Sequence, residues 1–288
     1  MASLREIKSK ISSVKSTQQI TSAMRMVSTV KLARAQRITE NFRPYQQKVS
    51  QILTNFLSTQ GSVTSLYEEQ REVNKVAIVV FSGNMNLCGA FNSNVVKEFV
   101  KTTDQLAHLP KENIEIYAIG KKIAQAIKKM EFEPKMELDE LANNPNYDET
   151  VEIADSLMKQ FQEKEIDKVI VIYHHFISKG SQTLTSETLL PISLDDLKEQ
   201  KDEGYIDYIV EPDKETIFSE LIPQVIKLKL YSYLIESHAS EHAARSIAMQ
   251  AATDNADDLL EELSLVYNKS RQQSITNELL DIIGATFK

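Results

Sequence analysis

The sequence contains a single cysteine, only seven glycines and seven prolines, and no long apolar run among its 288 residues. One thiol cannot form an internal disulfide, so a buried core must hold the fold, and an apolar fraction of 42% can supply one. No uncharged apolar stretch approaches the roughly 20 residues that a membrane-spanning helix needs. The basic N-terminus lacks the apolar stretch of a secretory signal, so we expect no cleaved leader. These absences exclude a disulfide scaffold and argue against an integral membrane protein.

Glycine and proline are absent from two long stretches, residues 1–43 and residues 224–283. Because both residue types break helices, these stretches predict two long helical arms around a middle that needs turns. At about 1.5 Å per residue, the arms would be roughly 85 Å and roughly 100 Å long. Charge is also divided, since residues 1–57 carry a net charge of +8 and the remainder carries −16. The sequence therefore predicts one basic arm on an acidic body.

Apolar residues in both arms recur at alternating spacings of three and four, the pattern of a coiled-coil seam. The first seam comprises Leu4, Ile7, Ile11, Val14, Ala35, Ile38, Phe42, Tyr45, Val49, Ile52 and Phe56, with polar or small Gln18, Thr21, Ser28 and Lys31 between its two runs. The second comprises Met249, Ala252, Ala256, Leu259, Leu263 and Val266 and continues through Ile275, Leu279 and Ile282. We expect Asp213 to start the last helix, Pro44 to kink the first, and Pro223 to mark a kink or a fresh helix start.

The middle of the chain alternates between strand and helix patterns. We expect strands at residues 75–81, 114–119 and 168–173, helices at 92–108, 121–130 and 148–163, a hairpin of 174–178 with 183–192, and a strand near 206–210. This order is typical of parallel strands joined by crossover helices. The predicted fold is a Rossmann-like α/β domain with a mostly parallel sheet (residues 74–211). It is flanked by an N-terminal helix (1–58) and a C-terminal helix (212–288) that form an antiparallel coiled coil.

Two motifs could carry chemistry, and neither has the context that the chemistry requires. The loop Ser82–Ala90 follows a strand and precedes a helix, where phosphates often bind, but it lacks the Walker lysine and the three-glycine fingerprint. We therefore interpret it as a structural turn. His238 and His242 match the H-x-x-E-H zinc pattern, but the carboxylates farther along, Glu261 and Glu262, lie about 30 Å up the same helix. We interpret these histidines as ordinary helix-surface residues and a zinc-dependent hydrolase as a remote possibility.

The basic arm can be interpreted in two ways. Its cations are Arg5, Lys8, Lys10, Lys15, Arg25, Lys31, Arg34, Arg37, Arg43 and Lys48. Such a helix can bind nucleic acid or anionic lipid. However, no aromatic residue precedes Phe42, and the charges surround the helix without forming a stripe, so an acidic protein partner explains them at least as well. A coiled-coil adaptor that binds nucleic acid or anionic membrane remains the alternative function.

Longer motifs resemble the gamma subunit of the F-type ATP synthase, of the bacterial type. They are Ile7–Ile11 and Thr17–Val27 near the start, and Ala239–Arg245, Met249–Ala256 and Tyr267–Thr276 in the closing half. The resemblance covers the whole chain in order. It departs in the middle, where the family commonly has S-D-R-G-L-C-G-G and this chain has S-G-N-M-N-L-C-G at Ser82–Gly89.

The resemblance implies a central rotor shaft that couples a flow of protons or sodium ions to ATP synthesis. Its coiled coil would stand inside a hexameric head of alpha and beta subunits, and its α/β domain would form a foot on the c-ring beside the epsilon subunit. The chain would hold no catalytic residue, cofactor or metal and would bind no nucleic acid. It would be peripheral on the cytoplasmic face of the bacterial inner membrane, attached only through the ring.

The resemblance also implies two groups of contact residues. Met24 and Arg25 match the helix segment that faces acidic loops of the beta subunits, and Arg245 matches an arginine beside that segment. The positions that would hydrogen-bond with the head higher up are Arg271, Gln272, Thr276 and Glu278. The stretch facing the polar loops of the ring would contribute Tyr208 and Glu211.

Overall fold

The computed structural model of the chain describes residues 4–59, 65–193, 211 and 213–286. It divides into two compact units, residues 1–30 with 245–288, here the paired-helix unit, and residues 31–244, here the α/β unit. Two long helices, α1 (Leu4–Thr59) and α7 (Lys214–Thr286), each contribute to both units. The helices run on through Pro44 and Pro223, so the expected fresh start at Pro223 is wrong. Asp213 does precede α7, and its Oδ1 accepts a hydrogen bond from the Thr216 N–H at 2.8 Å.

A five-stranded sheet forms the centre of the α/β unit. Its strands are β1 (Val76–Phe81), β2 (Ile114–Ile119), β3 (Met136–Glu137), β4 (Lys168–Ser178) and β5 (Ser181–Leu190), in the order β3-β2-β1-β4-β5. All neighbours pair in parallel except β4 and β5, which are antiparallel. Every residue of β1 is buried, because a central parallel strand is covered on both faces. The prediction of a mostly parallel sheet is confirmed.

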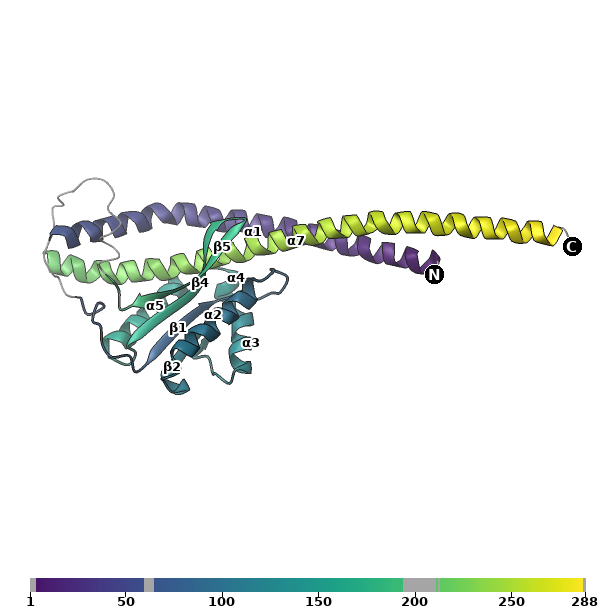
Figure 1. Cartoon of the computed structure of the whole chain (residues 1–288). Helices are drawn as coiled ribbons and strands as arrows, with labels where there is room; N and C mark the ends of the chain where they lie inside the picture. Colours follow the sequence, from purple (N-terminus) through teal and green to yellow (C-terminus); the bar gives the residue numbers. More distant parts are fainter. Residues whose placement is uncertain (1–3, 60–64, 194–210, 212, 287–288) are drawn as a thin grey trace. The chain divides into compact units, whose positions relative to one another are not determined.

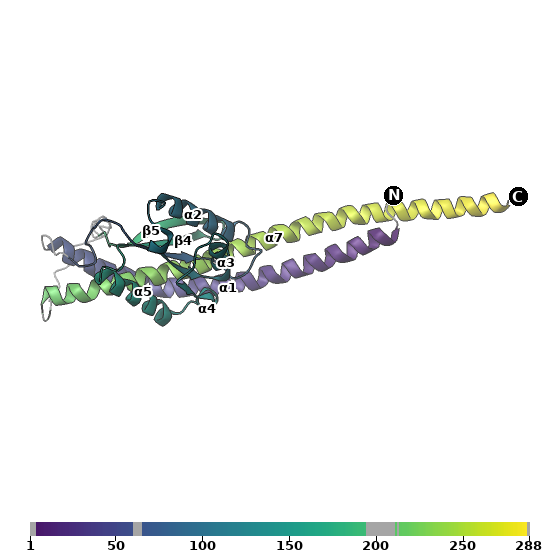
Figure 2. The same cartoon turned by 90° about the horizontal axis from the view of Figure 1, so that it is seen from below.

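Helices cover both faces of this sheet. The short helices of the unit are α2 (Phe91–Gln105), η1 (Lys111–Asn113), α3 (Lys121–Lys129), α4 (Asp139–Asn143) and α5 (Tyr147–Gln162). The apolar residues of α2 and α3 pack with Val76, Ile78 and Val80 of β1. The opposite face packs against α4, α5 and the parts of α1 and α7 that belong to this unit. Figure 1 and Figure 2 show α2 and α3 on the side of the sheet away from these long helices.

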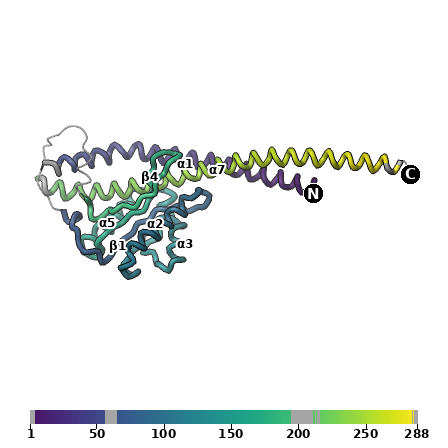
Figure 3. Tube along the Cα trace, in the orientation of Figure 1, coloured from purple at the N-terminus to yellow at the C-terminus, as the bar shows by residue number. Residues whose placement is uncertain are grey.

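The β4–β5 hairpin is longer than its pattern predicts. Residues 174–178, expected as a separate strand, continue β4, and the turn at Lys179-Gly180 is confirmed. Near its tip, Phe176 packs against a small cluster formed by Leu32 and Ala35 of α1 with Ala239 and Ala243 of α7. Figure 3 traces the hairpin alongside these helices. The sequence did not predict β3 or α4, which are too short to show a period, and the strand expected near 206–210 lies outside the described residues.

Within the α/β unit, the predicted seam of α1 is confirmed at Ala35 and Val49, which are buried, but it shifts by one residue at two other positions. Leu32 and Leu53 are buried, whereas the expected seam residue Lys31 is exposed and Ile52 is only partly covered. Tyr45, also expected in the seam, is 52% exposed. A straight α-helix has 3.6 residues per turn, so a strict repeat of three and four drifts around its surface. Where two apolar residues adjoin, as at Ile52-Leu53, packing decides which of them is buried.

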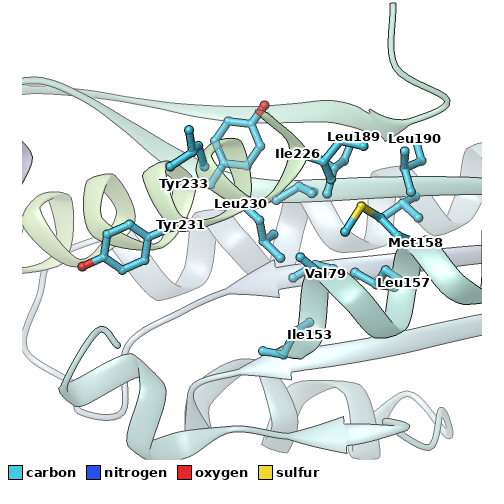
Figure 4. Packing of buried hydrophobic residues seen from close by; sticks show 14 of the residues in the cluster. Val79, Ile153, Leu157, Met158, Leu189, Leu190, Ile226, Leu230, Tyr231 and Tyr233 are labelled. Atoms are coloured by element: carbon cyan, nitrogen blue, oxygen red, sulfur yellow. The ribbon is translucent and has the colours of Figure 1, made fainter. Parts of the chain in front are cut away.

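A carboxylate shared by two tyrosines fixes the hairpin to α7. Glu187 of β5 accepts hydrogen bonds from the Tyr173 hydroxyl at 2.8 Å and from the Tyr233 hydroxyl of α7 at 2.7 Å. Burial, together with the neighbouring Glu187 charge, raises the pKa of both tyrosines, so they remain protonated donors. These contacts adjoin the apolar layer that includes Leu189 and Ile226 (Figure 4). Together they hold the antiparallel edge of the sheet against the helix.

A buried histidine makes the stability of the α/β unit depend on pH. His174 of β4 is 4% exposed and stacks on Phe91 at 4.1 Å between ring centroids. Burial lowers its pKa to about 4. In the unfolded chain the ring takes up its proton near pH ~6.5, so between these values the unfolded state binds more protons. The contribution to stability is therefore complete above about pH 6.5 and is lost progressively as the pH falls toward about 4.

We expect this group to cost about 2 kcal/mol of unfolding free energy between pH 7 and pH 5. Urea unfolding followed by tyrosine fluorescence, at both pH values, measures it. His174→Phe keeps a ring stacked on Phe91 but cannot titrate. The drop in unfolding free energy between pH 7 and pH 5 should therefore be about 2 kcal/mol smaller in this variant than in wild type. His108→Gln, at an exposed position, serves as the control and should keep the wild-type pH dependence. An equal loss in His174→Phe and wild type would contradict the assignment.

Candidate partner-binding surfaces

Polar side chains join α1 and α7 across the seam of the paired-helix unit. Hydrogen bonds connect Thr29 with Ser246 at 3.1 Å, Thr21 with Thr253 at 2.9 Å, and Gln18 with Asp257 at 2.8 Å. As residue numbers rise along α1 they fall along α7, so the pair is antiparallel, as predicted. Figure 1 and Figure 2 both show the two helices side by side here. Of the expected polar seam residues, Gln18 and Thr21 thus bond across to α7, whereas the buried Ser28 donates to a carbonyl of its own helix.

Arg25 occupies one position of this seam, and its contact was not predicted. Its Nη1 donates a hydrogen bond to the Gln250 side-chain oxygen. The Gln250 Nε2 in turn donates to Asp254 Oδ1 at 2.6 Å. Met24 beside it is partly buried, and its carbonyl accepts a bond from the Ser28 hydroxyl at 2.8 Å. Only the antiparallel register places Gln250 opposite Arg25, and no motif in either helix signals it.

The C-terminal part of α7 extends beyond the described part of α1. Continuing the register of the cross-seam bonds places Leu4, the first described residue of α1, level with Arg271. Figure 3 shows α7 continuing past this point. The large apolar side chains beyond it are between 48% and 63% exposed: Ile275, Leu279, Leu280, Ile282 and Ile283. Among the described residues, no helix of this chain covers this stripe.

The structure places the predicted head-contact residues in the paired-helix unit but not in one cluster. Arg271, Gln272, Thr276 and Glu278 are all exposed on the C-terminal part of α7. The Thr276 hydroxyl donates to the backbone carbonyl of Gln272 at 2.9 Å, within the helix itself. Arg245, by contrast, is only 6% exposed and lies level with Val30, not with Arg25. Most of its surface is therefore already covered within this chain.

The predicted ring-contact residues can be located only in part. Glu211 is exposed and precedes α7 by three residues. Tyr208 lies outside the described residues. The placement of Glu211 leaves its carboxylate accessible to a partner.

The loop Ser82–Ala90 and the histidine pair, the two motifs that could carry chemistry, make contacts within the fold. In the loop after β1, the Gly83 N–H donates to Asn92 Oδ1 at 2.9 Å, and Asn84 joins the Lys121 N–H to the Asp139 carbonyl. These groups are engaged within the α/β unit, as expected of a structural turn. The Nε2 atoms of His238 and His242 lie 3.2 Å apart. The interpretation of both histidines as helix-surface residues is wrong for His242, which is only 5% exposed. Within the described ranges, no three His, Cys, Asp or Glu side chains come together in a group that could hold a metal ion.

None of the helices in the described part of the chain combines the length and the apolarity needed to cross a bilayer.

Comparisons with known proteins agree with this architecture. A family model described as ATP synthase matches residues 3–286. The ATP synthase gamma chain of Bacteroides fragilis is 51% identical over 288 residues, and that of Phocaeicola vulgatus is 48% identical over 287 residues, each alignment covering 99% of both chains. A chain in the structure of the Euglena gracilis mitochondrial ATP synthase, OSCP/F1/c-ring, rotational state 3, is similar in fold. Its TM-score is 0.65 at 20% identity, covering 99% of this chain and 93% of that one. Because the model and these relatives span nearly the whole sequence, the chain belongs to the ATP synthase gamma chain family.

Proposed function

We propose that this chain is the central rotor shaft of an F-type ATP synthase. The observation that carries the proposal is the exposed apolar stripe on α7 beyond Arg271. Exposed apolar patches on a protein mark interaction sites, and none of the described residues of this chain packs over this stripe. Exposed polar side chains flank it and could bond to a surrounding protein. Family membership supports the same function, since relatives about half identical over the full length are named ATP synthase gamma chain.

In this function the chain works without a catalytic residue of its own. The shaft helices, residues 1–58 and 212–288, contact the alpha and beta subunits of the head, and the α/β domain, residues 74–211, rests on the c-ring beside the epsilon subunit. A flow of protons or sodium ions turns the ring. Each shaft angle then stabilises a different conformation at each nucleotide site, because the contacts differ from angle to angle. The chain reaches the membrane only through the ring, at the cytoplasmic face of the bacterial inner membrane.

The contact residues fall into two groups in this proposal. The head contacts are Met24, Arg25, Arg245, Arg271, Gln272, Thr276 and Glu278, and the ring contacts are Tyr208 and Glu211. The exposure of Arg271, Gln272 and Glu211 supports their assignment. The buried Arg245 would contribute through its charge and its neighbours rather than through a large contact area.

Reconstitution tests this function. The purified chain is mixed with alpha and beta subunits from Bacteroides fragilis, and assembly and ATPase activity are measured. We expect a complex that contains all three chains and an ATPase activity that depends on this one, whereas the chain alone hydrolyses no ATP. Replacing Ile275, Leu279 and Ile283 by serine should weaken assembly. A chain that fails to join the complex but binds RNA, DNA or anionic vesicles would support the adaptor alternative instead.

A further inference from the structure

Arg25 differs from the other residues that bridge the seam of the paired-helix unit. The bonds between Thr21 and Thr253 and between Thr29 and Ser246 join neutral hydroxyl groups. Arg25 instead brings a permanent positive charge, and its partner is the neutral amide of Gln250. A partly buried guanidinium is usually paired with a carboxylate. In the part of the chain that the structure describes, no carboxylate forms an ion pair with Arg25.

The carboxylate of Asp254 is linked to Arg25 only indirectly, through the side chain of Gln250. Gln250 gives its amide N–H to Asp254 Oδ1 at 2.6 Å, and this bond turns its carbonyl oxygen toward Arg25. Asp254 therefore orients the amide without neutralising the guanidinium directly. The planar guanidinium carries five N–H donors, and the Gln250 oxygen accepts from Nη1 alone. The remaining donors keep the fork geometry that suits a carboxylate.

We propose that Gln250 and Asp254 are positioning residues that hold the Arg25 guanidinium, still charged, for a carboxylate of the partner. This inference rests on the proposed function, in which α1 and α7 contact the subunits of the head. The partner group is an acidic side chain on the surface that surrounds the paired helices. The basic N-terminal arm, with its net charge of +8 over residues 1–57, is complementary to such a surface.

A charge swap between the two positions provides the test. In the double variant Gln250→Glu with Asp254→Asn, the net charge of the chain is unchanged, and the new asparagine can donate to the new glutamate. The only large difference is that the carboxylate now contacts Arg25 directly and neutralises it. We expect the free chain to melt at the same or a higher temperature. Steady-state ATPase of the reconstituted head should nevertheless fall about fivefold, as in Arg25→Gln.

A melting temperature that stays the same or rises while turnover falls indicates that Gln250 and Asp254 position Arg25. A merely structural role would lower both stability and turnover. A matched control, Asn255→Asp with Asp258→Asn, moves a charge over a similar distance on the exposed surface of α7 and should change neither property. Adding the charge swap to Arg25→Gln should cause no further loss, because the group it acts through is gone.

Three results would overturn the inference: wild-type turnover in the charge swap, a parallel loss of stability and turnover, or an additive loss in the Arg25→Gln background. The wild-type chain distinguishes these results from failure of the proposed function. If wild type does not assemble with alpha and beta subunits, the proposed function is wrong. If it assembles and the charge swap is equally active, only the positioning role is wrong.

Discussion

Gly120→Ala is expected to destabilise the α/β unit by at least about 4 kcal/mol, because two independent obstacles meet at this residue. Its φ of 107° lies in a region that residues with a Cβ rarely adopt. A Cβ built there would also lie 2.2 Å from the carbonyl oxygen of Ser82. Ser82 has little freedom to move away, since its N–H donates to the Ile119 carbonyl at 2.8 Å and its hydroxyl accepts from the Ile123 N–H at 3.1 Å.

Urea unfolding of the full chain, followed by tyrosine fluorescence and near-ultraviolet circular dichroism, measures this loss. Gly180→Ala is the matched control, because no atom beyond the adjoining residues lies within 4 Å of a Cβ built at this position in the hairpin turn. Its unfolding free energy should stay within about 0.5 kcal/mol of wild type. A Gly120→Ala chain as stable as the control would show that the loop after β1 can rearrange, and the structural account of that loop would be wrong.

Arg271→Ala and Gln272→Ala are each expected to lower the ATPase rate of the reconstituted head by about tenfold. Both side chains are exposed on α7, and among the described residues Arg271 forms no ion pair. A bond to the head that forms at one shaft angle and breaks at the next adds to the barrier of a rotational step. Its loss therefore affects turnover and not the folding of the chain.

The decisive comparison is steady-state ATPase of the reconstituted head beside far-ultraviolet circular dichroism of the free chain. Helicity should be unchanged in both variants, because neither side chain supports the fold. Gln273→Ala, which changes the exposed neighbour, should leave turnover near the wild-type value. Normal turnover in both Arg271→Ala and Gln272→Ala would show that these residues are solvated surface, and the residue-level transfer from the family would be wrong.

The main elements of the fold follow from local patterns in the sequence. Two stretches without glycine or proline predict α1 and α7, and the run at residues 75–81 predicts a buried parallel strand. Helix and strand periods arise from interactions between residues close in sequence, so they are visible without knowledge of the partner. The candidate contact residues Arg271 and Gln272 were found through longer family motifs, and no local period would have indicated them.

The pairing of distant residues was decided only by tertiary structure. The sequence alone determined that α1 carries an apolar seam, but packing decided that Leu32 and Leu53 are buried in place of Lys31 and Ile52. It determined that Arg25 is one of many cations in a basic arm, but the antiparallel register decided that Gln250, 225 residues away, accepts its hydrogen bond. Likewise, only the tertiary structure brings the Tyr173 and Tyr233 hydroxyls to the Glu187 carboxylate. A period fixes which side of an element is apolar, whereas the register between two elements depends on the whole set of contacts that form together when the chain folds.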